Sequence, residues 1–190
     1  MANQRTTKVL VLGDSLSAEY GLRRGSGWVA MLEQRLRART NPAVVVNASI
    51  SGDTSAGALS RLPALLTQHK PTHVVIEIGA NDALRGMPLT HTRDNLRAMA
   101  RAAQATGAKV VLVGMQMAPN YGKDYGAGFA RMYANLARSE HTALVPFFLA
   151  GVADAPDADR LFQMDRLHPN ESAQARLLDN VLPVLQPLLP

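Results

Sequence analysis

Five polar turns carry the side chains of this sequence that are best suited to chemistry. They are residues 13–17, 47–54, 79–82, 115–122 and 165–169. Each contains Gly, Pro, Asn, Asp or Ser, the residues that favour turns. The first four turns each follow a short apolar run, and the fifth precedes the last amphipathic segment. We therefore expect at least the first four to gather at one edge of a sheet.

Ser15, in the first of these turns, is the candidate nucleophile. A serine after a strand is often only a helix cap, so the nucleophile reading needs a general base and a third group that orients it. His168 can be that base. Asp165 lies three residues earlier, where one turn brings its carboxylate to the ring nitrogen that faces away from Ser15. Pro169 favours an extended conformation at His168 and stops a helix from running through it.

The other histidines are weaker candidates because of where they lie. His69 and His73 flank the start of the third apolar run, which is the amino end of a strand. His91 and His141 fall between predicted elements, and a lone histidine is more often a surface or a hydrogen-bonded core residue. The pattern thus predicts a triad of Ser15, His168 and Asp165.

Acyl transfer also needs hydrogen-bond donors for the oxyanion that develops on the substrate. Three are available at successive strand ends: the backbone N–H of Ser15, the backbone N–H of Gly52 and the side-chain amide of Asn81. Taken singly, Gly52 is also explained as a turn glycine and Asn81 as an Asx turn. Their occurrence together with Ser15 favours an oxyanion hole.

The elements that position these turns alternate along the chain. Continuous apolar runs, as in strands covered on both faces, are followed by longer amphipathic segments. The predicted strands are 9–12, 44–46, 74–78, 110–113 and 144–145, and the predicted helices are 28–39, 55–68, 92–106, 125–139 and 171–185. This alternation predicts an α/β fold, a three-layer α/β/α sandwich around a five-stranded parallel sheet, with a flavodoxin-like strand order.

Composition limits the remaining possibilities. The 190 residues fit one domain, residues 1–190, and cysteine is absent, which excludes disulfides and thiolate chemistry. The net charge is +5, but the arginines are scattered at helical spacing and aromatic residues are few, so we expect no nucleic-acid partner. The apolar run 9–12 is too short for a membrane span or a leader, so we expect no stable membrane insertion. The compartment depends on whether a leader was removed: periplasmic or secreted if so, otherwise cytoplasmic.

Together, the four motifs resemble the SGNH (GDSL-type) hydrolase superfamily, which is named for a Ser, a Gly, an Asn and a His. The residues that carry the resemblance are Gly13-Asp14-Ser15-Leu16, Gly52, Gly79-Ala80-Asn81-Asp82 and Asp165-Arg166-Leu167-His168-Pro169. Segments 59–66, 81–86 and 120–122 are similar to the bacterial thioesterase I, arylesterase and lysophospholipase L1 branch.

The resemblance implies a serine hydrolase that cleaves aryl esters, acyl thioesters and lysophospholipids and needs no metal or organic cofactor. It implies that residues 80–86 form a mobile loop, that 115–119 line an acyl groove, and that substrate contacts come from Asp14, Asp82, Leu84, Met117 and Pro119. Two departures from the family pattern bear on specificity. Glu19 replaces a small residue and could alter the pocket mouth, and Arg166 could favour anionic substrates.

Three alternatives stay open on the sequence. Asp14, Asp53, Asp82 and His168 could serve as ligands of a metal-dependent hydrolase. A flavodoxin-like binding or signalling domain fits less well, because a phospho-acceptor site would want paired acids after the first strand and a lysine after the fifth. A carbohydrate deacetylase of the same superfamily would share the triad, although Met115 and Met117 favour acyl chains over sugars.

Overall fold

The computed structural model describes residues 6–190, apart from the side chain of residue 119. Five parallel strands form one sheet in the order β2-β1-β3-β4-β5: β1 (Lys8–Gly13), β2 (Val44–Asn47), β3 (His73–Glu77), β4 (Lys109–Val113) and β5 (Ala143–Val145). In the register, Leu10 of β1 lies opposite Val46 of β2 and Val74 of β3. The flavodoxin-like order predicted from the sequence is confirmed.

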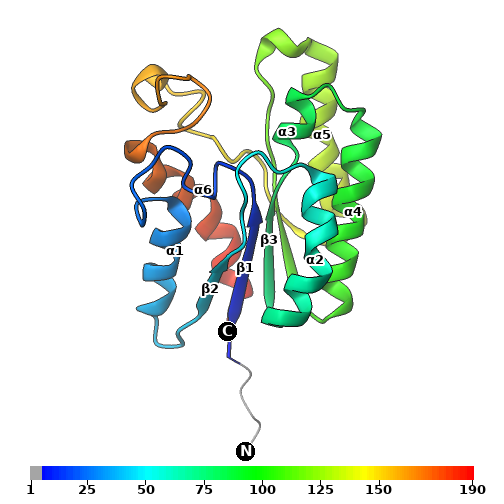
Figure 1. Ribbon diagram of the computed structural model, residues 1–190, viewed down its shortest axis with the longest axis vertical. Coiled ribbons are helices and arrows are strands. Elements are labelled where there is room, and N and C mark those ends of the chain that lie inside the picture. The colour runs from blue at the N-terminus through cyan, green and yellow to red at the C-terminus, as the bar shows by residue number, and fades with distance from the viewer. Residues whose placement is uncertain (1–5) are drawn as a thin grey trace, which may run out of the picture.

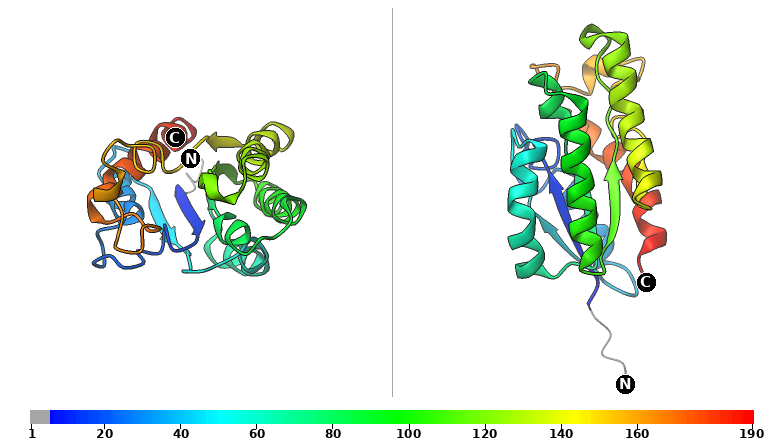
Figure 2. Two further views of the ribbon diagram at one scale, coloured as in Figure 1. Left: turned by 90° about the horizontal axis from the view of Figure 1, so that it is seen from above. Right: turned by 90° about the vertical axis from the view of Figure 1, so that its right-hand side faces the viewer.

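Helices cover both faces of the sheet, which lies between them in Figures 1 and 2. Helix α1 (Trp28–Arg37) packs with α6 (Gln174–Leu185) on one face. On the other face, α2 (Ser55–His69) packs with α4 (Leu89–Ala105), and α4 packs with α5 (Lys123–Ser139). Short 3₁₀ segments are η1 (Pro119–Tyr121), η2 (Ala158–Arg160), η3 (Glu171–Ala173) and η4 (Gln186–Leu188). The α/β/α sandwich is confirmed.

The central strands are buried because helices cover them on both sides. Every residue of β3 is buried, and in β1 all but Lys8 are. Burial of these continuous apolar runs supplies the main driving force for the fold. It also leaves the carboxyl ends of the strands as one rigid edge, from which the polar turns project (Figure 1). Within residues 6–190, no helix has both the length and the apolar character that crossing a bilayer requires.

Element boundaries differ from expectation in two informative places. Residues 80–86, expected as a loop, contain a short helix, α3 (Ala80–Leu84), whose first residues hold Asn81. The last helix is preceded by the 3₁₀ turn η3 rather than starting at residue 171, because Asn170 caps that turn by accepting the N–H of Ser172. Both turns adjoin candidate site residues.

Candidate active site

Ser15 lies in the turn that follows β1. The carbonyl oxygen of Asp14 accepts the N–H groups of Ser17 (3.2 Å) and Ala18 (2.9 Å), which bends the chain sharply and presents the Ser15 side chain at the sheet edge. The Oγ of Ser15 lies 2.9 Å from Nε2 of His168, a residue 153 positions further along the chain. Ser15 thus has a candidate base within hydrogen-bond reach.

Asp165 orients the ring of His168. The Nδ1 of His168 lies 2.6 Å from Oδ2 of Asp165, while Oδ1 of Asp165 accepts the N–H groups of Leu167 (2.9 Å) and His168 (3.0 Å). The N–H of His168, its ring and then the N–H of Leu167 lower the pKa of Asp165 to about 2. Because an ionised carboxylate only accepts hydrogen bonds, the ring proton belongs on Nδ1, and Nε2 is free to accept the Ser15 hydroxyl proton.

A small antiparallel turn holds the Asp165–His168 segment. Phe162 and Pro169 form an isolated bridge, and the N–H of Gln163 donates to the carbonyl oxygen of His168 (2.8 Å). Arg166, at the tip, has a φ of 55°, in the left-handed region that costs a residue other than glycine conformational energy. The structure therefore brings together Ser15, His168 and Asp165, as the motifs led us to expect.

Asn81 lies beside the nucleophile, at the start of α3. Its Nδ2 donates to the carbonyl oxygen of Asp53 (2.9 Å) and to Oδ2 of Asp14 (3.2 Å). Both partners are acceptors, so the nitrogen of the amide must face them. A substrate oxyanion would share this nitrogen and compete for the longer of the two bonds.

Gly52 lies next to Asp53, the residue that accepts from Asn81. Its φ is 78°, and a side chain at this position would meet open space. Gly52 therefore keeps the backbone exposed near Asn81 in a conformation that suits glycine. It is not among the residues that line the cavity described next, so its donor role remains a prediction.

A cavity of about 520 Å³ opens at Ser15 and His168. Leu84, Met115 and Met117 contribute apolar lining, as expected for 84 and 117. The apolar lining missed by sequence reasoning follows β5 and consists of Phe147, Leu149, Ala153 and Phe162. The Pro-Phe-Phe run directly after β5 was the available signal for it. The expected contact at Pro119 rests on a side chain outside the described part of the structure.

Two expected substrate contacts take other roles. Asp82 is fully buried, and its carboxylate accepts hydrogen bonds from the backbone and hydroxyl of Ser55 and from the hydroxyl of Thr92. The expectation that Asp82 touches substrate is therefore wrong for this structure. Asp14 does border the cavity but is only 1% exposed. Its carboxylate accepts from Leu16 and Asn81, so it acts on neighbouring residues.

Sequence reasoning also missed Glu77, the last residue of β3. It is 2% exposed, and its Oε2 accepts the hydroxyl of Ser17 (2.8 Å) and the N–H of Asp14 (3.3 Å). Burial, and then the charge of Asp14, raises the pKa of Glu77 well above its ordinary value. A carboxyl group inside an apolar strand run was the signal for this buried acid pair.

Glu19 does not shape the pocket mouth as expected. Its carboxylate accepts the backbone N–H groups of Gly25 (2.9 Å) and Gly27 (2.8 Å) and so closes the loop before α1. Its φ of 61° lies in the left-handed region, which explains physically why a small residue such as glycine suits this position.

The remaining candidate metal ligands have protein partners. Asp53 forms an ion pair with Arg61 at 2.7 Å, and Asp82 is held by Ser55 and Thr92. Over the part of the chain that the structure describes, His, Asp and Glu side chains do not gather in threes as metal ligands.

With this geometry, the chain belongs to the GDSL-like Lipase/Acylhydrolase family, which it matches over residues 11–176. It is 54% identical over 181 residues to Esterase TesA of Pseudomonas aeruginosa, covering 95% of this chain and 89% of that one. It is 41% identical to Thioesterase 1/protease 1/lysophospholipase L1 of Escherichia coli K12, covering 95% and 84%. A crystal structure of TesA superposes with a TM-score of 0.92 at 54% identity, covering 96% of this chain and 100% of that one.

Proposed function

We propose that this chain hydrolyses carboxylic esters and thioesters through an acyl-enzyme formed on Ser15. The observation that carries the proposal is the chain of bonds from Ser15 Oγ through the His168 ring to Asp165, at the mouth of an apolar cavity. Relatives named esterase and thioesterase support the same reaction.

In the first half-reaction, Ser15 Oγ attacks the acyl carbon while Nε2 of His168 takes the hydroxyl proton. Asp165 remains ionised and stabilises the imidazolium that forms. Ser15 N–H, Gly52 N–H and the Asn81 amide donate to the oxyanion. The imidazolium then protonates the leaving alkoxide or thiolate, which departs as alcohol or thiol.

In the second half-reaction, water attacks the acyl-enzyme and His168 again acts as the base. The tetrahedral intermediate collapses, Ser15 regains its proton and the carboxylic acid leaves. This cycle needs no metal ion and no organic cofactor.

The cavity lining favours acyl chains as the group that enters it. Apolar side chains from three segments of the chain, among them Leu84, Met117 and Phe147, lie within one cavity with Ser15. Burying methylene groups against such a lining is favourable by about 0.8 kcal/mol each. We therefore infer that aryl esters, acyl thioesters and single-chain lipid esters are substrates, in preference to acetylated sugars.

Hydrolysis of p-nitrophenyl esters from acetate to palmitate tests the proposal. Ser15→Ala should lower turnover by about 10⁴–10⁶, whereas Ser60→Ala, at an exposed position on α2, should leave it unchanged. A chelator should have no effect on either. A Ser15→Ala protein with wild-type turnover would exclude this mechanism, and activity confined to acetate esters would favour the deacetylase alternative.

A further inference from the structure

Gln163 connects the two segments that carry the nucleophile and its base. Its Nε2 donates to the carbonyl oxygen of Tyr20 (2.8 Å) and to that of Pro169 (3.2 Å). Tyr20 belongs to the turn that begins at Ser15, and Pro169 directly follows His168. One side-chain amide therefore spans the Ser15–His168 pair from the outside, using both of its hydrogens.

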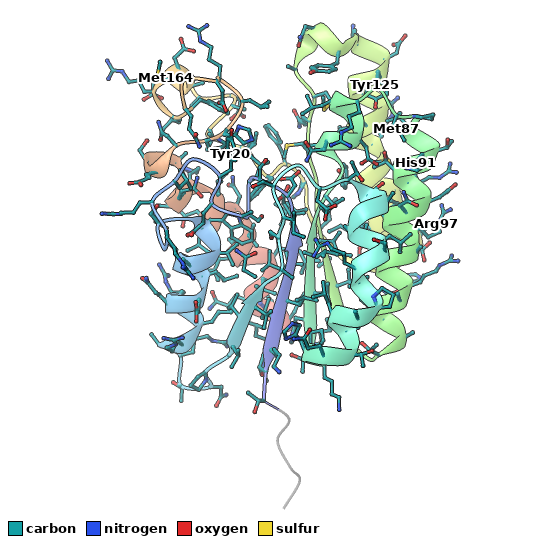
Figure 3. All side chains as sticks on the ribbon, in the orientation of Figure 1. Tyr20, Met87, His91, Arg97, Tyr125 and Met164 are labelled. Atoms are coloured by element: carbon teal, nitrogen blue, oxygen red, sulfur yellow. The ribbon has the colours of Figure 1, made fainter. Side chains whose placement is uncertain are left out.

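The backbone of Gln163 holds the other side of the same turn. Its N–H donates to the carbonyl oxygen of His168 (2.8 Å), and its own carbonyl accepts the N–H of Arg166 (2.9 Å). Residues 164–167 between them are exposed, and Met164 projects into solvent above Tyr20 (Figure 3). Packing therefore contributes little to fixing this turn, and hydrogen bonds must do so.

Tyr20 transmits the position of its segment to the base. Its ring lies 4.4 Å from the His168 ring, centroid to centroid, at a tilt of 41°. The Tyr20 carbonyl that Gln163 holds and the Tyr20 ring that covers His168 belong to one residue. A displacement of the Gln163 amide is thus expected to change the position of His168 relative to Ser15.

The chain next to Tyr20 leaves room for this amide. A Cβ at Gly21 would lie 2.0 Å from Oε1 of Gln163, so only glycine permits the side chain to reach Tyr20. Gly25, four residues further on, shares the left-handed conformation, with a φ of 84° against 70° for Gly21, but a Cβ there would meet nothing within 4 Å.

We propose that Gln163 is a positioning residue, which ties the Ser15 turn to the His168 turn and thereby sets the Ser15–His168 distance. The inference rests on the proposed serine mechanism. Gln163 touches neither proton nor substrate in that mechanism and acts through Tyr20, Pro169 and His168. A misplacement of about 1 Å between reacting groups can lower a rate about 10²-fold, so losing the tie should reduce chemistry more than binding.

The first test is Gln163→Met, which keeps the length of the side chain and removes both donors. We expect kcat on p-nitrophenyl butyrate to fall by about 10- to 100-fold, with KM within about threefold of wild type. Labelling of Ser15 by a fluorophosphonate should slow in parallel, and the melting curve should show a folded protein. A kcat within about threefold of wild type, or an equal change in KM, would overturn the proposal.

The second test approaches the same bond from the nucleophile turn and remains informative if Gln163→Met does not fold. Gly21→Ala and Gly25→Ala carry a similar backbone strain, but only the first displaces the Gln163 amide. We expect Gly21→Ala to lower kcat by about tenfold or more relative to Gly25→Ala. Equal kcat values would overturn the proposal. A wild-type protein without any ester turnover would instead refute the proposed function.

Discussion

Glu77 accepts the backbone N–H of Asp14 at 3.3 Å, which places two buried carboxyl groups together directly beneath Ser15. Burial raises the pKa of Asp14 to about 6, and burial together with the charge of Asp14 raises the pKa of Glu77 further above its ordinary value. His168 and Asp53 are the other charged groups that act on Asp14. We assign the proton of the pair at neutral pH to Glu77.

This pair predicts a specific dependence of stability on pH. A carboxyl group whose pKa is raised by folding stabilises the protein fully below its unfolded pKa, and that stability is lost as the pH rises through the folded pKa. For Asp14 the window runs from 3.8 to about 6, and for Glu77 it begins at 4.5 and extends higher. Stability should therefore fall as the pH rises across this range.

Glu77→Gln should remove much of that loss, because the amide keeps the shape of Glu77 and cannot ionise. Relative to wild type, the variant should gain on the order of 2 kcal/mol in free energy of unfolding between about pH 4 and pH 8. Urea unfolding at a series of pH values measures this, with Glu33→Gln on the exposed face of α1 as control. Parallel pH curves for Glu77→Gln and wild type would contradict the prediction.

Asn81→Ala tests the side-chain donor of the oxyanion hole. The amide that donates to Asp53 and Asp14 would stabilise the transition state more than bound substrate, so kcat should fall by about 10²–10³ while KM changes little. Steady-state kinetics on p-nitrophenyl butyrate supply both constants. An unchanged kcat would remove Asn81 from the oxyanion hole without affecting the assignment of Ser15.

Asp82 supports α3 from below. Its fully buried carboxylate has three donors from Ser55 and Thr92, so Asp82→Ala leaves buried donors unsatisfied and should cost about 3 kcal/mol in free energy of unfolding. Asp94→Ala is the matched control: its ion pairs with Arg93 and Arg97 are exposed and should contribute less than about 1 kcal/mol. Equal losses for the two variants, measured by urea unfolding, would disprove the buried-support role.

The sequence was sufficient for the layers, the strand order and the grouping of Ser15, Asn81 and His168. Continuous apolar runs identify strands buried on both faces, and the carboxyl ends of parallel strands meet at one edge. The sequence pattern could not reveal the partners of buried polar groups. Glu77 was hidden in an apolar run, and the role of Asp82 depends on Ser55 and Thr92 from neighbouring elements.

The left-handed backbone conformations were equally invisible. Glu19 adopts a φ of 61° because its carboxylate reaches Gly25 and Gly27 eight residues or fewer away. That hydrogen bonding turns the side chain toward the loop before α1, where residue type alone had suggested the pocket mouth. The apolar lining from Phe147 and Phe162 also required the tertiary path of the segment after β5.

Arg166 provides a test of substrate charge selectivity. It lies at the exposed tip of the His168 turn and lines the cavity, where Asp154 and Asp159 place opposing charges. Arg166→Ala should lower kcat/KM about fivefold for a p-nitrophenyl ester with a distal carboxylate, since an exposed ion pair contributes up to about 1 kcal/mol. The same variant should leave neutral p-nitrophenyl butyrate unaffected, and Arg166→Lys should retain the preference. Equal losses on both esters would show that Arg166 acts through the conformation of the turn and not through its charge.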